Sequence, residues 1–117
     1  MIELVVVMAI IALLVSIAAP RYFRSVERAR ENVLRQNLSL MRDAIDKFNS
    51  DNGRYPETIA ELAAKRYIRK VPDDPVTGSE DTWVLVKPPE GSGLSGVYDI
   101  KSGAEGTALD GSQYSSW

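Results

Sequence analysis

The stretch of sequence that decides the fold is Met1–Pro20, which reads MIELVVVMAIIALLVSIAAP. Fifteen of the 16 residues in Leu4–Ala19 are apolar, and Glu3 is the only charged residue before Arg21. As an α-helix, Met1–Pro20 rises about 30 Å, which is the thickness of hydrocarbon that a membrane-spanning helix must cross. We therefore predict that this stretch crosses a membrane as a helix.

A cleavable signal peptide is the alternative interpretation of this stretch. Such a peptide has basic residues before a shorter apolar core and a small-residue cleavage site after it. No basic residue precedes this core, and Ala18-Ala19-Pro20 is a poor cleavage site. The orientation of the helix in the membrane is left undetermined by the arginines that follow the apolar core. These arginines are Arg21, Arg24, Arg28 and Arg30. By the positive-inside rule they place the rest of the chain in the cytoplasm, unless basic residues also precede the core.

Composition excludes several classes of function. With 117 residues the chain is expected to form one domain. It contains no Cys and no His, which excludes disulfides, thiol chemistry, the usual zinc sites and His-based catalysis. The net charge of −2 gives no reason to expect a nucleic-acid partner. Asp73 and Asp74 are poor candidates for a catalytic pair, because neighbours in a proline-flanked turn point apart.

The helix is expected to continue as an amphipathic rod to Asn52-Gly53, where glycine favours a helix end. Pro20 is expected to kink it or open it locally near residues 17–20. The predicted buried face consists of apolar residues spaced by three and four, namely Tyr22, Val26, Ala29, Val33, Leu34, Leu38, Met41, Ile45 and Phe48. The charged residues opposite are expected to lie in solvent, namely Arg21, Arg24, Glu27, Arg28, Arg30, Glu31, Arg35, Arg42, Asp43, Asp46 and Lys47.

This rod is about 75 Å long, and only a bilayer or copies of the same helix can cover its apolar half. The sequence predicts pairs between Glu27 and Arg30 and between Glu31 and Arg35, which have helical-neighbour spacing.

Residues 53–117 are predicted to form a small head on the second half of the rod. Glu57–Lys65 predicts a short helix with Ile59 and Leu62 turned inward. Thr82–Lys87 and Val97–Lys101 predict two antiparallel strands joined by Pro88–Gly96. The fold class is therefore α+β, with three parts: a hydrophobic helix half 1–20, an amphipathic helix half 21–52, and an α+β head 53–117.

The tail Ser102–Trp117 is expected to have little regular structure, because seven of the eight glycines lie after residue 77. Leu109, Tyr114 and Trp117 are its predicted apolar anchors.

The segment Met1–Pro20 resembles the amino-terminal signature of the superfamily of type IV pilins and type II secretion pseudopilins. Aligned on the glutamate, Met1 stands two positions before it, where those proteins have Leu or Met, so the sequence begins after the family's first two residues, phenylalanine and threonine, and after its basic leader. The resemblance implies that a prepilin peptidase removes such a leader from the precursor, and that the leader's basic residues keep the head in the periplasm. From the residues alone, Glu3 either lies at the helix start at headgroup depth, where the helix dipole favours an acid, or pairs with a cation on a neighbouring subunit. The resemblance implies the second, in which Glu3, within a signature that includes Met1 and Pro20, meets a neighbour's amino terminus during subunit assembly.

The head is similar to that of the G-type major pseudopilins, the pilin-like subunits of type II secretion systems. The matching segments are Asn52–Pro56, Tyr67–Pro75 with Gly78 and Trp83, and Tyr98–Gly103. The similarity implies a structural subunit that is stored in the bacterial inner membrane and polymerises into a helical filament that helps export folded proteins. Implied partners are further copies, minor pseudopilins and the assembly platform, and no catalytic residue is implied.

The same similarity implies a calcium site in the carboxyl-terminal loop, and it is only partly matched. The candidate ligands are Ser102, Glu105, Asp110 and Ser112. Calcium takes six to eight oxygen ligands, and two carboxylates give little charge for tight binding. Ordinary turns at Gly103, Gly106 and Gly111 are the alternative.

Two other functions stay open at the level of sequence. A type IV pilin of a surface pilus, used for adhesion, motility or DNA uptake, has the same amino-terminal signature, although many such pilins carry a disulfide that this chain lacks. A monomeric single-pass membrane protein with a ligand-binding head is the other, and it predicts that no filaments form.

Overall fold

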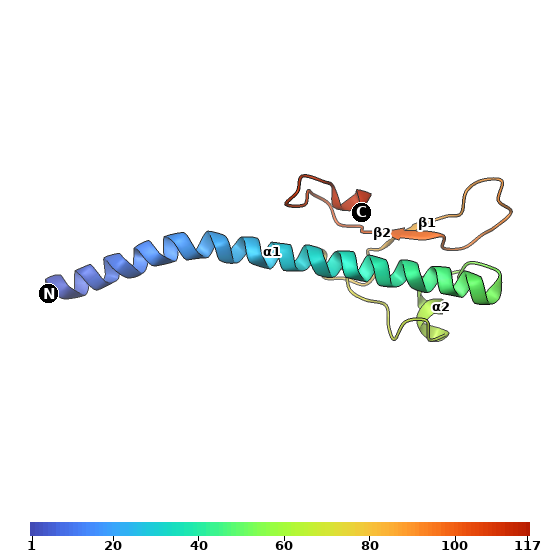
Figure 1. Cartoon of the computed structure of the whole chain (residues 1–117), viewed down its shortest axis with the longest axis horizontal. Helices are drawn as coiled ribbons and strands as arrows, with labels where there is room; N and C mark the ends of the chain where they lie inside the picture. The colour runs from blue at the N-terminus through green and yellow to red at the C-terminus, as the bar shows by residue number, and fades with distance from the viewer.

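The computed structural model describes all 117 residues and has the shape of a rod with a head along one end (Figure 1). Helix α1 (Ile2–Asn52) has 51 residues, and the molecule measures 78 × 28 × 19 Å. Its radius of gyration is 21.2 Å, whereas a compact chain of this length has roughly 13 Å. One helix therefore runs the full length of the molecule, as predicted.

Helix α1 continues through Pro20 without a break, so the expected local opening near residues 17–20 is not found. The ribbon instead bows over its first half (Figure 1). Proline removes only one helical hydrogen bond, and the exposed turn before it is free to adjust. The carboxyl end is as predicted: Gly53 adopts φ 68°, and its amide donates to the Asn49 carbonyl oxygen at 2.8 Å.

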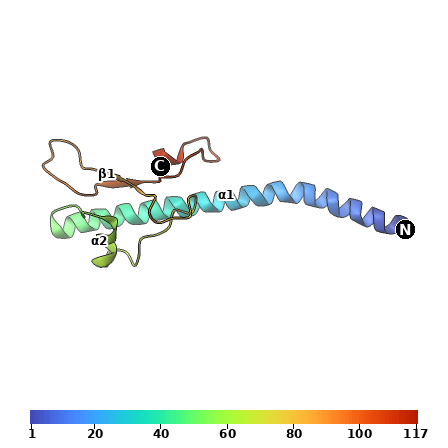
Figure 2. The same cartoon turned by 180° about the vertical axis from the view of Figure 1, so that it is seen from behind.

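The head lies on two sides of α1, with helix α2 (Ile59–Ala64) on one side and the strands on the other (Figures 1 and 2). Helix α2 begins after Thr58, whose hydroxyl oxygen accepts from the Glu61 amide at 3.2 Å. The Glu61 carboxylate in turn accepts from the Glu57 amide at 2.9 Å. Thr58 thus caps the helix, and Glu61 fixes the residue before the cap, which together help so short a helix to form here.

Strands β1 (Val84–Val86) and β2 (Asp99–Lys101) form a two-stranded antiparallel sheet in which Leu85 pairs with Ile100. Both strands are shorter than predicted. Pro88 and Pro89 cannot donate to a ladder beyond β1. Before β1, the Thr82 hydroxyl lies 2.7 Å from that of Thr77, which places Thr82 in the preceding loop.

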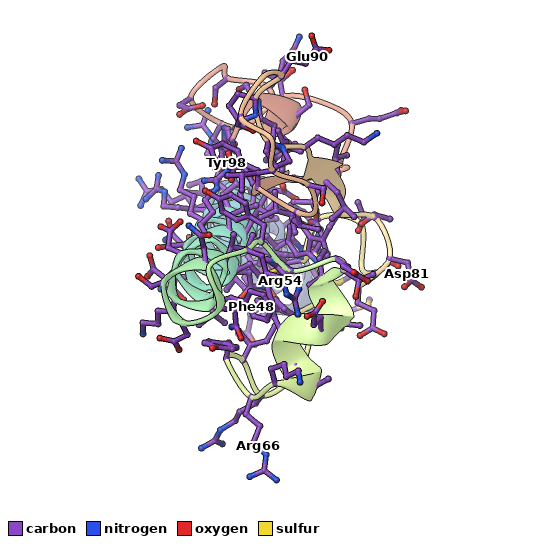
Figure 3. The ribbon with its side chains drawn as sticks, turned by 90° about the vertical axis from the view of Figure 1, so that its right-hand side faces the viewer. Phe48, Arg54, Arg66, Asp81, Glu90 and Tyr98 are labelled. Carbon is purple, nitrogen blue, oxygen red and sulfur yellow. The ribbon has the colours of Figure 1, made fainter.

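The core consists of two clusters along the second half of α1. The first joins α1 to β2 and the tail and contains Leu34, Leu38, Met41, Trp83, Ile100, Ala104, Ala108 and Tyr114. The second joins α1 to α2 and contains Ala44, Ile45, Phe48, Leu62, Ile68 and Val97. The prediction that Tyr22, Ala29 and Val33 belong to the buried face is wrong, because the head covers only one face of α1 and only from Glu31 onward. Seen along the rod, Phe48 and Arg54 lie together beside α2, whereas Arg66, Asp81 and Glu90 point outward (Figure 3). The Arg54 guanidinium carbon is 4.9 Å from the centre of the Phe48 ring.

The tail has one turn of 3-10 helix, η1 (Tyr114–Ser116), and otherwise little regular structure, as predicted. Tyr114 is buried and Trp117 half-buried, which confirms two of the three predicted anchors. Leu109 is 50 % exposed, so its prediction as an anchor is wrong. Its backbone amide, instead of its side chain, attaches this part of the tail to α1.

Candidate assembly surface and tail contacts

The first half of α1 has no packing partner in the molecule. The first buried residue along the chain is Glu31. The large apolar side chains between Leu4 and Ile17 are each 49–66 % exposed. This part of α1 is long and apolar enough to cross a membrane, and none of its apolar window is buried. Lipid or another protein surface is required to keep it from water.

The three residues predicted for assembly lie at different heights on this surface. Met1 occupies the position before the first turn of α1, and Glu3 is exposed within that turn without an ion pair. Pro20 is exposed about 25 Å further along the helix. The structure therefore brings Met1 and Glu3 together but not Pro20. Their role in assembly stays a prediction, since it concerns contacts between copies.

The four predicted calcium ligands do not converge on one point. The Ser102 hydroxyl is buried and donates to the Asp74 carboxylate at 2.5 Å. Glu105 is exposed and has no hydrogen-bond partner in the molecule. Asp110 and Ser112 do lie together, with the Ser112 hydroxyl donating to Asp110 at 2.6 Å. No group of three acidic side chains is placed to hold a metal ion, so the donor set fits calcium poorly in this arrangement.

Charged residues of α1 instead bind the tail. The Glu31 carboxylate accepts from the Leu109 amide at 2.8 Å and from the Tyr114 hydroxyl at 3.0 Å. Arg35 lies 3.3 Å from Asp110, and its guanidinium carbon is 4.1 Å from the centre of the Trp117 ring. We call Glu31 and Arg35, with Arg42 described next, the tail clasp.

Arg42 makes the most contacts of the tail clasp. Its guanidinium donates to the Asp99 carboxylate at 2.9 Å, to the Ile100 carbonyl oxygen at 2.9 Å and to the main-chain oxygen of Trp117 at 2.8 Å. One side chain thus joins α1 to β2 and to the last turn of the tail. Hydrogen bonds from a charged group of this kind are stronger than neutral ones.

Two ionisable groups of the tail are perturbed by these contacts. Hydrogen bonds from the Ser112 hydroxyl and amide, and then the charge of Arg35, lower the pKa of Asp110. Burial, followed by the hydrogen bond to the Glu31 carboxylate, raises the pKa of Tyr114 to about 12. Asp110 is therefore held as a carboxylate and Tyr114 as a neutral phenol.

The prediction that Glu31 and Arg42 lie in solvent is wrong, and so is the predicted pair between Glu31 and Arg35. The pair between Glu27 and Arg30 does form, at 3.6 Å. Helical spacing could have indicated that Glu31 is buried, because it precedes the core residues Leu34 and Leu38 by three and seven positions and so lies on their face of α1.

Asp74 is a further buried acid, for which the sequence pattern predicted no structural role. Its carboxylate accepts from the Val76 amide at 2.8 Å and from Ser102, while Asp73 beside it is exposed. The two carboxylates thus point apart, as expected of neighbours in this turn. The available signal was an aspartate followed by proline and, four positions on, by Gly78, which is typical of a turn closed by the aspartate side chain.

A rod whose first half is bare and apolar, with an α+β head packed on its second half, defines a pilin-like protein. Comparison with curated proteins narrows this class. The chain is 30 % identical to the type II secretion system core protein G of Escherichia coli (strain K12), with 87 % of this chain and 77 % of that protein aligned. The proteins of the same name from Klebsiella michiganensis and Klebsiella pneumoniae are 27 % and 29 % identical over this whole chain, which covers 89 % and 91 % of them.

The chain therefore belongs to the family of type II secretion core protein G, the G-type pseudopilins. The expectation drawn from its amino-terminal and head motifs is confirmed, and the surface-pilus alternative is not favoured. A scan against protein-family models gives no match. No solved structure matches the chain either.

Proposed function

We propose that this chain is the structural subunit of a type II secretion pseudopilus. In this proposal the subunit is stored in the inner membrane with its head in the periplasm, and it polymerises into a helical filament that helps export folded proteins. The family relationship supports the secretion role. The single structural observation that carries the proposal is the first half of α1, which is apolar, exposed and without any packing partner in its own chain.

The two states of the subunit follow from that surface. In the membrane, lipid covers the apolar half of α1, and in the filament the corresponding halves of neighbouring copies cover it. The head keeps its own core in both states, because that core begins only at Glu31. The arginines that follow the span favour a cytoplasmic head, and basic residues in a leader on the precursor would outweigh them and leave the head in the periplasm.

The proposed role needs no catalysis by this chain. The named relatives are components of a secretion system, which favours a structural role. Minor pseudopilins, an assembly platform and the prepilin peptidase that processes the precursor are the partners that the role requires.

Glu3 is the residue that we propose guides assembly. A carboxylate at the centre of a bilayer costs about 2.5–3.5 kcal/mol, and Glu3, in the first turn of α1 at the end of the span, has no ion-pair partner in its own chain. The α-amino group of a neighbouring copy would supply the missing positive charge. We expect Glu3→Ala to leave the head folded but to reduce the yield of filaments sheared from cells, measured by electron microscopy and immunoblotting.

The matched control is Glu80→Ala, which removes an exposed carboxylate from the head and should leave the filament yield unchanged. Equal yields from wild type and Glu3→Ala, at equal amounts of subunit in the membrane, would refute the role of Glu3. Full-length protein that proved soluble and monomeric without detergent would refute the proposed function as a whole.

A further inference from the structure

Three arginines of α1 have no partner in the molecule. Arg21, Arg24 and Arg28 are exposed, and none of them forms an ion pair or donates a side-chain hydrogen bond. The other arginines of α1 do have partners: Arg30 pairs with Glu27, and Arg35 and Arg42 belong to the tail clasp. The three guanidinium groups are therefore accessible to a ligand from outside the chain. We call them the arginine row.

The arginine row faces one side of the helix. Arg24 and Arg28 follow Arg21 by three and seven positions, which places all three on the same face. Helical side chains lean toward the amino terminus of their helix. In α1 that direction leads back to the apolar segment, so the guanidinium groups reach toward the membrane surface.

The height of the arginine row matches that of a lipid headgroup layer. Measured along the helix from Pro20, Arg21, Arg24 and Arg28 lie about 1.5, 6 and 12 Å beyond the end of the span. A headgroup layer adds roughly 5–8 Å on each side of the hydrocarbon. Arg21 and Arg24 thus lie inside that layer, and Arg28 leans back onto it.

Two exposed aromatic residues beside the arginine row are a second indication of the membrane–water interface. Tyr22 and Phe23 are 67 % and 66 % exposed, and their rings meet edge to face at 6.0 Å. They do not contact the head, whose first buried contact on α1 is at Glu31. Exposed aromatic rings next to an apolar span are typical of the membrane–water interface. The aromatic rings and the arginine row together therefore fit a membrane surface.

We propose that the arginine row binds the phosphate groups of anionic phospholipids at the membrane surface on the head's side. A guanidinium group binds phosphate through two parallel hydrogen bonds, and each arginine near an anionic surface strengthens the attraction. The inference rests on the membrane anchoring in the proposed function and is independent of filament formation. The bound lipid holds the stored subunit at a defined depth and orientation.

The test uses the full-length chain in bilayers of phosphatidylcholine containing phosphatidylglycerol. Electron spin resonance with spin-labelled lipids measures which lipid is held at the protein. We expect a preference for phosphatidylglycerol over phosphatidylcholine on the order of fivefold or more, which falls toward one in the triple variant Arg21→Gln/Arg24→Gln/Arg28→Gln. The matched control Lys65→Gln/Arg69→Gln/Lys70→Gln removes three exposed, unpaired positive charges from the head and should keep the preference.

Other results would overturn the proposal. An unchanged preference in the triple variant excludes the arginine row as the lipid site. Inorganic phosphate and unlabelled phosphatidylglycerol are each added as competitors at matched ionic strength. If inorganic phosphate removes the spin-labelled phosphatidylglycerol from the protein as effectively as the unlabelled lipid does, the arginine row binds free phosphate instead of lipid. If the triple variant loses only cross-linking between copies, the row is a contact between subunits. Failure of the chain to insert at all would count against the proposed function, so the two failures are distinguishable.

Discussion

The two halves of α1 are one continuous helix, yet they depend on different surroundings. In residues 2–30 no side chain is buried, whereas residues 31–52 contribute Leu34, Leu38, Met41, Ala44, Ile45 and Phe48 to the core. The second half therefore obtains its stability from the head of the same chain. The first half must obtain it from lipid or from other copies. Folding of the head and assembly of the filament are therefore separable, and a mutation in one half of α1 can affect one without the other.

The largest expected effect tests the second half alone. Met41 is fully buried in the core, and Met41→Asp places a charge there without a partner. We expect a loss of more than about 4 kcal/mol, enough to unfold the head. The measurement is a thermal melt of the full chain in detergent micelles, followed by near-ultraviolet circular dichroism.

The adjacent residue provides the control for this change. Leu40 is 49 % exposed, so Leu40→Asp introduces the same charge one position away without entering the core. Its melt should stay close to that of the wild type. If both variants melted alike, the division of the helix into a buried and an exposed face would be wrong.

A smaller effect is expected at Glu31, where the two halves of α1 meet. Glu31→Ala leaves the Leu109 amide and the Tyr114 hydroxyl without their acceptor, and we expect a loss of about 2–3 kcal/mol. Denaturant titration measures it. Glu27→Ala, which breaks only an exposed pair one turn earlier, should cost less than about 0.5 kcal/mol. Equal losses would show that the tail clasp contributes no more than a surface ion pair.

How far the sequence predicts this molecule depends on which interactions form each part. The rod, its end at Asn52 and the face formed by Leu38, Met41 and Ile45 follow from periodicity and from Gly53, which are local signals. The tail clasp does not, because it joins residues 57–83 positions apart, such as Arg42 with Asp99 and Glu31 with Tyr114. A charged residue looks solvated in sequence until its distant partner is known.

The strands also show that the sequence predicts local features better than features that depend on distant residues. Alternation predicted them correctly in place and pairing, but their length depends on where the backbone loses partners. Pro88 ends the ladder locally. At the other end Thr82 is held in the preceding loop by the contact between its hydroxyl and that of Thr77. Gly103 lies so close to the Thr82 carbonyl oxygen that a side chain there would collide with it, and the sequence does not reveal this approach.

High pH should lower the stability of the fold through ionisation of Tyr114, whose hydroxyl donates to Glu31 of the tail clasp. The pKa of Tyr114 is raised to about 12, whereas an unfolded tyrosine titrates near 10. Between these values the unfolded chain releases the proton that the folded chain retains, so stability is full below pH 10 and falls as the pH rises to 12. We expect this to cost at most about 2–3 kcal/mol.

Comparison with Tyr114→Phe isolates this contribution. Phenylalanine cannot ionise, so the variant should lose less stability than the wild type between pH 10 and pH 12. Urea titrations across that range measure both slopes. Tyr67 is present in both proteins, and its own pKa, raised by the hydrogen bond to Asp51, cancels in the comparison. Parallel slopes would mean that the Tyr114 phenol is not held neutral by the fold.

The smallest expected effect concerns calcium, and it sharpens what holds the tail to the second half of the helix. A calcium ion present at 100 times its dissociation constant would stabilise the head by about 2.7 kcal/mol. We expect no such gain between chelator and added calcium in a thermal melt, because Ser102 is engaged with Asp74 while Arg35 and Ser112 already bind Asp110. A gain that Asp110→Asn abolishes would show that calcium binds here. It would then have to compete with Arg35 for the same carboxylate, and the tail clasp would be the metal-free form of this loop.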